Sequence, residues 1–304
     1  MSSCITLEFT SSASPITQSA TRRRMALIDL ILDLAGLLLW LNWRSASFDP
    51  LTQSPPTTLI GTLRRAEPSK SRGWYFLVAV IGLLFLRALL YWQIGPAVDW
   101  MPTLKLGAIS ISFRSDFFSR AILFSVLSFS ATLIIFYLWL LFLSVVNART
   151  EEADPLQKLV RLHLGWVDRW PWPLKLFLPL LFVTALWYGF NPLLVRWEII
   201  PAVKSALHRL EQAGAIGLGV YLAWKYLITG LLILYLLSSY VYLGNHVFWN
   251  FLTVTGRNML KPLRILPLQI GRIDLAPLFA ITVVLVAARF AERGLTDLYR
   301  RLPF

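Results

Sequence analysis

The sequence predicts an all-α, polytopic membrane protein of about six transmembrane helices, arranged as repeated helical hairpins with amphipathic interfacial loops. Of its 304 residues, 57% are hydrophobic and only 15% are charged, whereas soluble domains carry about 25% charged residues. The apolar residues gather in runs of about 20, the length that crosses about 30 Å of hydrocarbon. Trp and Tyr lie at many run ends, where an amphipathic ring favours the headgroup zone.

The chain before the first run is rich in Ser and Thr and ends in Arg22, Arg23 and Arg24. Such a composition predicts a disordered N-terminal tail over residues 1–24. It does not have the order of elements of a cleavable signal peptide, since the basic residues follow a polar segment and no cleavage site follows a short apolar stretch. Translation is expected to start at either Met1 or Met25.

Six apolar runs are expected to form membrane helices, because a backbone in lipid must satisfy its polar groups internally. The fourth run, which opens near Leu174 and holds Pro179, has the weakest pattern. The runs cover residues 25–43, 74–93, 121–146, 174–190, 217–243 and 274–291.

The runs pair into three hairpins, residues 25–93, 121–190 and 217–292, followed by a C-terminal tail over 293–304. The first, third and fifth runs start 96 residues apart. Asn42 lies seven residues before Asp49-Pro50-Leu51, and Asn147 lies seven before Asp154-Pro155-Leu156. This spacing predicts an internal repeat. The alternative is chance similarity between membrane sequences.

Two loop segments, 156–169 and 247–266, mix apolar and basic residues at helical spacing. This pattern predicts amphipathic helices that lie in the headgroup plane with their apolar sides down. A short helix packed on a protein partner is the alternative. Both readings leave room for other membrane proteins as partners.

The formal net charge is +13, and nearly all Lys and Arg lie between the apolar runs. In a membrane protein they meet anionic headgroups there, so the expected partner is the lipid bilayer and not nucleic acid. The two sides of a six-span arrangement hold 13 and 14 Lys and Arg, a balance that favours neither orientation. The single cysteine, Cys4, excludes an intramolecular disulfide and a multi-cysteine metal site.

Among the charged residues inside the runs, we single out Asp29, Asp33, Arg87 and Lys225. Asp29 and Asp33 share one helix face because they are four residues apart. Counted from the run ends, Arg87 and Lys225 lie near the same depth, so we expect an intramembrane charge cluster with a formal charge of zero. The alternative is that both cations extend separately to the interface while the aspartates face headgroups. As a hypothesis, the cluster locks the helices together or forms the polar point of an ion path.

The loop of the last hairpin carries residues that break regular structure or begin helices. Asp274 is placed to cap the following helix, with Pro277 tolerated in its first turn, and Arg264 is suited to a lipid phosphate or a carboxylate. The residues that we single out are Lys261, Pro262, Arg264, Pro267, Gly271, Asp274 and Pro277.

This loop resembles that of the YggT family, which carries a Pro-x-Arg…Pro-Pro…Gly-Gly-x-Asp-x-Ser-Pro pattern before a membrane helix. The departures are a single, shifted Pro267, Arg272 for the second glycine and Ala276 for the serine. The resemblance covers about residues 217–292, and the hairpin over 121–190 fits only as a degenerate repeat. The residues that match in spacing are Pro262, Arg264, Gly271, Asp274 and Pro277.

The resemblance implies a small integral protein of the bacterial inner membrane that is not an enzyme. Members of the family are linked to envelope organisation, to osmotic or ion homeostasis and, in plastids, to cytochrome assembly. A non-enzymatic membrane scaffold or assembly factor is therefore the expected function. The alternative is a small-ion channel or transporter that uses the charged residues within the membrane helices.

The sequence contains no phosphate-binding loop, zinc-binding His-Glu-x-x-His helix, nucleophile elbow or Cys-x-x-Cys pair. His163, His208 and His246 lie in different connections without a partner at ligand spacing. We therefore expect no catalytic residues, no cofactor and no metal, although His163 or His246 is the place where a haem or metal ligand would be sought.

Overall fold

The computed structural model is all-α in its main elements and divides into two compact units. The first unit comprises Met1–Pro102 and Arg114–Phe129, and the second comprises Thr103–Phe113 and Ser130–Phe304. The residues that the structure describes are 15–48, 72–97, 101–107, 109–113, 117–148, 155–197, 199–200, 205–241, 244, 246–265, 269–270 and 273–301.

Five stretches within the described residues are long and apolar enough to cross a membrane, so the chain is a multi-pass membrane protein. They are Arg24–Ser45, Gly73–Pro96, Phe118–Val146, Trp172–Arg196 and Ala206–Tyr240. They lie in helices α1 (Pro15–Phe48), α3 (Arg72–Ala97), α4 (Phe118–Val146) and α6 (Trp172–Arg196), and in a continuous run of α7 (Ala206–Gly219), the 3-10 segment η3 (Val220–Ala223) and α8 (Trp224–Tyr240).

The sixth apolar run forms α10 (Ala276–Arg301), but it is not among these five. Its uncharged part, from Ala276 to Ala288, has 13 residues before Arg289. At 1.5 Å per residue this part is about 20 Å long, shorter than a hydrocarbon core of about 30 Å. The helix continues to Arg301, so residues 293–301 of the expected C-terminal tail are helical.

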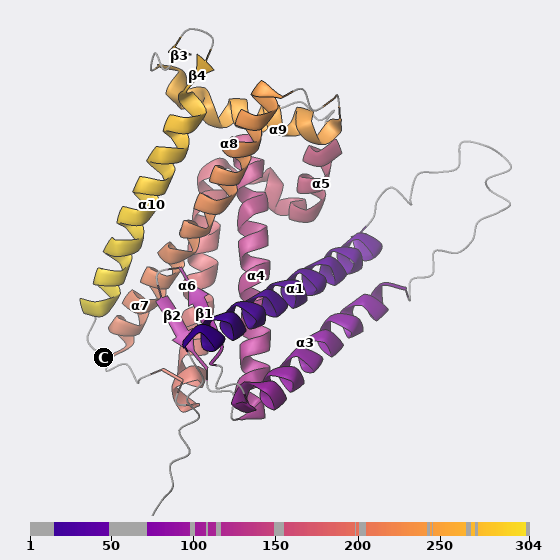
Figure 1. Cartoon of the computed structure of the whole chain (residues 1–304), viewed down its shortest axis with the longest axis vertical. Coiled ribbons are helices and arrows are strands. Elements are labelled where there is room, and N and C mark those ends of the chain that lie inside the picture. Colours follow the sequence, from indigo (N-terminus) through magenta and orange to yellow (C-terminus); the bar gives the residue numbers. More distant parts are fainter. Residues whose placement is uncertain are drawn as a thin grey trace, which may run out of the picture. The chain divides into compact units, whose positions relative to one another are not determined.

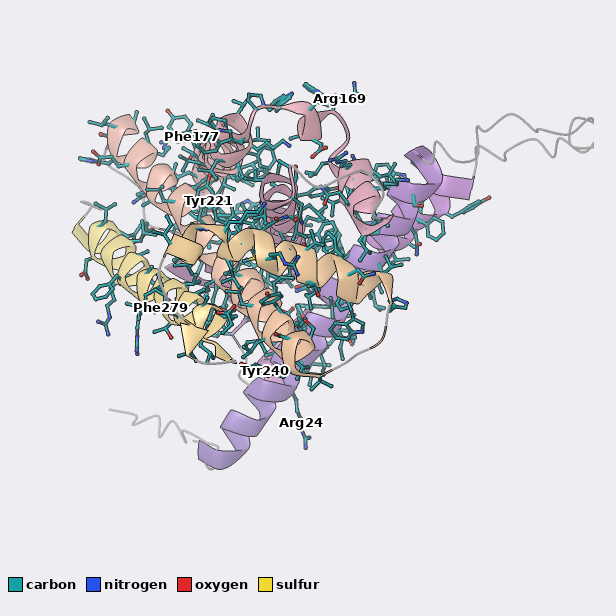
Figure 2. The ribbon with its side chains drawn as sticks, turned by 90° about the horizontal axis from the view of Figure 1, so that it is seen from above. Arg24, Arg169, Phe177, Tyr221, Tyr240 and Phe279 are labelled. Carbon is teal, nitrogen blue, oxygen red and sulfur yellow. The ribbon has the colours of Figure 1, made fainter. Side chains whose placement is uncertain are left out.

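The N-terminal boundary also differs from the expectation. Helix α1 begins at Pro15, so residues 15–24 are helical and only residues 1–14 of the expected disordered tail lie outside the described part. Extending an existing helix costs far less than starting one, which allows the polar segment to continue the membrane helix. In Figure 2, Arg24 at the start of the apolar stretch points away from α1.

In the first unit, α1 packs along α3, and the beginning of α4 completes the core. Gly36 of α1 faces the ring of Phe129, and a Cβ atom there would lie 2.8 Å from ring atom Cε2. Ser125 donates a hydrogen bond from Oγ to the carbonyl oxygen of Leu84 at 2.9 Å. Small residues and short polar bridges of this kind allow membrane helices to approach closely.

In the second unit, long helices are joined by short amphipathic ones. Helix α5 (Pro155–Leu164) with η2 (Gly165–Arg169) joins α4 to α6, and α9 (Val247–Leu260) with η4 (Lys261–Ile265) follows α8. The helices expected in 156–169 and 247–266 are thus confirmed over 156–169 and 247–265. Figure 1 shows α9 lying across α8, and the view from above in Figure 2 agrees.

Two short β-hairpins were not expected from the sequence. Strand β1 (Thr103–Leu106) pairs antiparallel with β2 (Ile109–Ser112), with Leu104 opposite Ile111. The alternation in this segment, with Leu104 and Ile111 buried, is the period of a strand. In the loop after η4, β3 (Gln269–Ile270) pairs antiparallel with β4 (Ile273–Asp274).

Candidate functional site

The most concentrated polar site lies inside the apolar helices of the first unit and centres on Arg87. Its guanidinium donates from Nη1 to Oδ1 of Asp33 at 2.6 Å and from Nη2 to Oδ1 of Asp29. Both contacts are ion pairs, and the Arg87 side chain is only 1% exposed. A buried arginine with two carboxylate partners is a strong, geometrically fixed interaction.

Two hydroxyl groups complete the cluster. Arg87 donates from Nε to Tyr91 Oη at 3.1 Å and from Nη2 to Ser128 Oγ at 2.8 Å. The hydroxyls donate in turn: Tyr91 to Oδ1 of Asp29 at 2.5 Å, and Ser128 to Oδ2 of Asp33 at 3.1 Å. The guanidinium also lies 5.5 Å from the centroid of the Tyr91 ring and 5.6 Å from that of Phe124. We call Asp29, Asp33, Arg87, Tyr91 and Ser128 the Arg87 cluster.

Helical periodicity explains how three helices supply these groups. Asp29 and Asp33 are one turn apart on α1, and Arg87 and Tyr91 are one turn apart on α3. Asp33 lies nine residues after Arg24, the first residue of its apolar stretch. Arg87 lies nine residues before Pro96, the last residue of its own apolar stretch. Nine residues correspond to about 14 Å, which is close to half of a hydrocarbon core of about 30 Å.

The structure brings together three of the four expected charges. Lys225 belongs to the second unit, where its Nζ atom lies 3.2 Å from Oε2 of Glu292. The expectation that Lys225 would neutralise the aspartates was wrong, because matching depth along two helices does not make them neighbours. Helix α8 packs on α10, which supplies Glu292 as the partner.

Sequence reasoning missed Tyr91 and Ser128. Tyr91 carried a usable signal, since it lies four residues after Arg87 on the same helix face. Ser128 carried none, because a serine in an apolar run is as often turned toward its own backbone as toward another helix.

The second unit holds a smaller charged cluster where α4, η2 and α6 meet. Lys175 is buried and donates from Nζ to Ser144 Oγ at 2.8 Å and to Asp168 Oδ1 at 3.3 Å. Ser144 donates to the same Asp168 oxygen at 2.5 Å, and Arg161 Nε lies 3.5 Å from its other oxygen. Asp168 thus ties the start of α6 to the end of α4.

A neutral network fixes the amphipathic helices beside this cluster. The buried side chain of Asn147 donates to Thr255 Oγ1 at 2.9 Å and accepts from Asn258 Nδ2 at 3.0 Å. Gln157 donates to the backbone oxygen of Asn147 at 2.9 Å. One residue at the end of α4 therefore holds both α5 and α9.

The residues of the YggT-like loop do not form one site within the described part. Asp274 accepts a hydrogen bond from the backbone N–H of Ala276 at 2.9 Å, and Pro277 is the second residue of α10, so the expected helix start is confirmed. Lys261 and Pro262 are exposed in η4, which also contains Arg264. Pro267 and Gly271 lie outside the described residues.

The histidines are held by local contacts. His163 Nδ1 lies 2.9 Å from the carbonyl oxygen of Leu159, and His208 Nδ1 lies 2.9 Å from Glu211 Oε2. His246 caps α9 by accepting from the backbone N–H of Phe248 at 3.3 Å. In the part of the chain that the structure describes, no group of three His, Cys, Asp or Glu is arranged to hold a metal ion.

No family model, curated protein or solved structure matches the chain. The resemblance of residues 217–292 to the YggT family therefore stays a prediction from the loop motif.

Proposed function

We propose that this protein is a non-enzymatic membrane scaffold or assembly factor of a bacterial inner membrane, which holds other membrane proteins against its interfacial helices. The observation that carries the proposal is the anchoring of α9. Its Thr255 and Asn258 are both bonded to Asn147 at the end of α4, and a helix tied in this way is a rigid platform.

The outer side of α9 supports the same proposal. Phe251 and Leu252 are buried toward the protein, whereas Val247 and Val254, which lie seven residues apart on another side of the helix, are exposed. An amphipathic helix at the headgroup level offers such a side either to lipid or to a partner helix. Because the helix is fixed in advance, a partner that docks there loses less conformational entropy than on a mobile loop.

We extend the proposal to the topology: α10 crosses the membrane as a sixth span, and the third hairpin is a YggT-like repeat. Two contacts support the sixth span. Leu232 of α8 packs in one core cluster with Ala276 and Ala280 of α10, and Lys225 pairs with Glu292. The order of a long helix, a short amphipathic helix with a 3-10 turn and a long helix occurs in both the second and the third hairpin.

Site-directed photo-crosslinking in native membranes tests the scaffold proposal. A photoreactive amino acid is placed at Val247 or Val254 of α9, and at Ile233, which is exposed on α8, as the control. The proposal predicts that both α9 positions capture the same membrane protein and that Ile233 does not. Crosslinks from α9 to lipid alone would contradict it.

A second candidate function is transport of a small ion, and the Arg87 cluster near the middle of the first-unit helices favours it. Proteoliposomes that contain the purified protein distinguish the two. A scaffold should give the ion leak of empty liposomes. Selective flux that disappears in an Arg87→Ala variant would replace the scaffold by a channel or transporter.

A further inference from the structure

A set of buried polar groups without partners lies on α6 and α7 in the second unit. Asn191 is 1% exposed and Gln212 is 2% exposed. Among the described residues, nothing hydrogen-bonds to either polar atom of the Asn191 amide or to Nε2 of Gln212, and the same holds for the buried Nε1 of Trp187 and Nε of Arg209. Because an unpaired buried polar group is costly and rare in native interiors, a group of them on one helix pair indicates a bound polar ligand.

The register of the two helices sets the level at which these groups meet. Helices α6 and α7 pack side by side (Figure 1). Thr184 donates from Oγ1 to the carbonyl oxygen of Ala213 at 3.4 Å, and the Arg209 guanidinium lies 5.6 Å from the centroid of the Tyr188 ring. The residue numbers rise along α6 as they fall along α7, so the helices are antiparallel and Tyr188 lies level with Arg209.

Helical spacing brings all four side chains to this level. Trp187 and Asn191 continue the stripe of Thr184 along α6, and Arg209 and Gln212 share one face of α7 because they are three residues apart. Helical side chains lean toward the N-terminus of their own helix. In an antiparallel pair, Asn191 and Gln212 therefore lean toward each other, and the four side chains reach the interface within about one turn of the same level.

The chemistry of these atoms selects an anion. Trp187 Nε1, Asn191 Nδ2, Arg209 Nε and Gln212 Nε2 are N–H donors, whereas Oδ1 of Asn191 is the single acceptor among the unpaired atoms. A metal cation takes several oxygen ligands at once, which this set does not supply. A water molecule needs acceptors for its own protons, and one acceptor does not balance four donors.

The charges around the site favour an anion as well. Arg209 lies in the first turn of α7, where the helix dipole adds partial positive charge, and it forms no ion pair with a described acid. Helix α6 contains no acidic residue, and the single acid of α7, Glu211, pairs with the exposed His208 at 2.9 Å. The nearly complete burial of Asn191 and Gln212 admits a small ion and not a lipid headgroup.

We propose that α6 and α7 bind a chloride ion, held by the N–H groups of Trp187, Asn191, Arg209 and Gln212 as the counter-ion of the Arg209 guanidinium. The ion ties the two helices together near the membrane surface where their connection lies. The inference concerns a different unit from the Arg87 cluster and does not rest on the scaffold proposal.

Thermal unfolding of the full chain in nanodiscs of zwitterionic lipid tests the proposal, with sodium chloride compared to sodium gluconate at equal ionic strength. A ligand that binds only the native state raises the melting temperature as its concentration rises. Chloride should therefore stabilise the wild type and gluconate should not, and the chloride NMR signal should broaden beyond that with empty nanodiscs. Equal melting temperatures in the two salts would overturn the proposal.

Three variants assign the effect to this site. Gln212→Glu supplies a carboxylate of the same shape in place of the ion, so its melting temperature should no longer depend on chloride. Trp187→Phe removes one donor and should weaken the apparent chloride affinity about 10-fold. Gln93→Glu, at an exposed glutamine of α3, is the control and should keep the wild-type dependence.

Trp187→Phe keeps the test decisive if Gln212→Glu does not fold, because it changes shape little. Wild-type chloride affinity in Trp187→Phe, or full chloride dependence in Gln212→Glu, would place the ion elsewhere and overturn the assignment.

Discussion

At the scale of single residues, Arg87 is the organising group of the first unit. Its guanidinium donates hydrogen bonds to two carboxylates and two hydroxyls, and these partners and Arg87 itself come from three helices. The Arg87 side chain is almost fully buried. Helical spacing was sufficient to predict that Asp29 and Asp33 share a face and that Arg87 reaches their level. It could not identify Lys225 as the partner of Glu292, because lateral neighbours depend on packing between helices.

Charge reversal tests whether Asp33 pairs with Arg87 and Lys225 pairs with Glu292 instead. Asp33→Lys should destabilise the protein by about 3–5 kcal/mol, because it leaves a buried cation beside Arg87. Adding Arg87→Asp should restore much of the loss, and adding Lys225→Asp should restore none. Unfolding in detergent micelles, followed by circular dichroism, measures all three. Rescue by Lys225→Asp, or a failure of Arg87→Asp to rescue, would refute the pairing.

The turn of the first β-hairpin makes a second prediction at this scale. Gly107 has φ +63°, and a Cβ atom there would lie 2.5 Å from the backbone oxygen of Gly219. Because neither backbone can yield cheaply, Gly107→Ala should cost about 1–3 kcal/mol. Gly189→Ala, at a position with nothing within 4 Å, is the control. Equal melting temperatures for the two variants would show that Gly107 of the hairpin does not pack closely against Gly219 of α7.

At the scale of elements, close helix packing depends on small residues. A Cβ atom on Gly217 of α7 would lie 2.5 Å from Thr184 Oγ1 and 3.1 Å from the backbone oxygen of Leu180 on α6. Gly214, one turn earlier, has nothing within 4 Å. The two positions therefore form a matched pair on one helix.

Gly217→Ala should force α6 and α7 apart and lower stability by about 1–3 kcal/mol. Gly214→Ala should be neutral or stabilise by about 0.5–1 kcal/mol, because alanine favours the helix. Thermal unfolding in nanodiscs compares them. If Gly214→Ala proves the more damaging of the two, the α6–α7 interface is assigned to the wrong face.

The residue that anchors the amphipathic helices, Asn147, has a counterpart in the proposed repeat, Asn42, that differs from it in burial. Asn147 and Asn42 occupy corresponding positions seven residues before an Asp-Pro-Leu sequence, but Asn147 is buried and Asn42 is exposed. Asn147→Leu should release α9, at a cost of about 1–3 kcal/mol for Thr255 and Asn258 left without this partner. Hydrogen exchange over α9 should then accelerate, and Asn42→Leu should leave it unchanged. Unchanged exchange in Asn147→Leu would remove the main support for the scaffold.

At the scale of the whole molecule, composition and run length were enough to predict a multi-pass helical membrane protein and five of its spans. Composition and run length could not predict where the helices end. Helix α1 already includes Pro15–Arg24 and helix α10 continues through Arg293–Arg301, and both segments lie outside the apolar runs. The β-hairpin of β1 and β2 was not predicted, although apolar and polar residues alternate in both strands. Strands of four residues give a much weaker signal than the long apolar runs on either side of them. Whether α10 crosses the membrane depends on its packing on α8 and not on its composition.

The side of the membrane on which each terminus lies tests the three-hairpin organisation most directly. Cys4 is the single native cysteine and reports on the N-terminus. In a Cys4→Ser background, Pro303→Cys reports on the C-terminus and Thr58→Cys on the loop after the first span. Membrane-impermeant maleimide is applied to sealed vesicles of both orientations. Six spans predict that Cys4 and Pro303→Cys are labelled from one side and Thr58→Cys from the other, whereas labelling of the two termini from opposite sides would contradict the account.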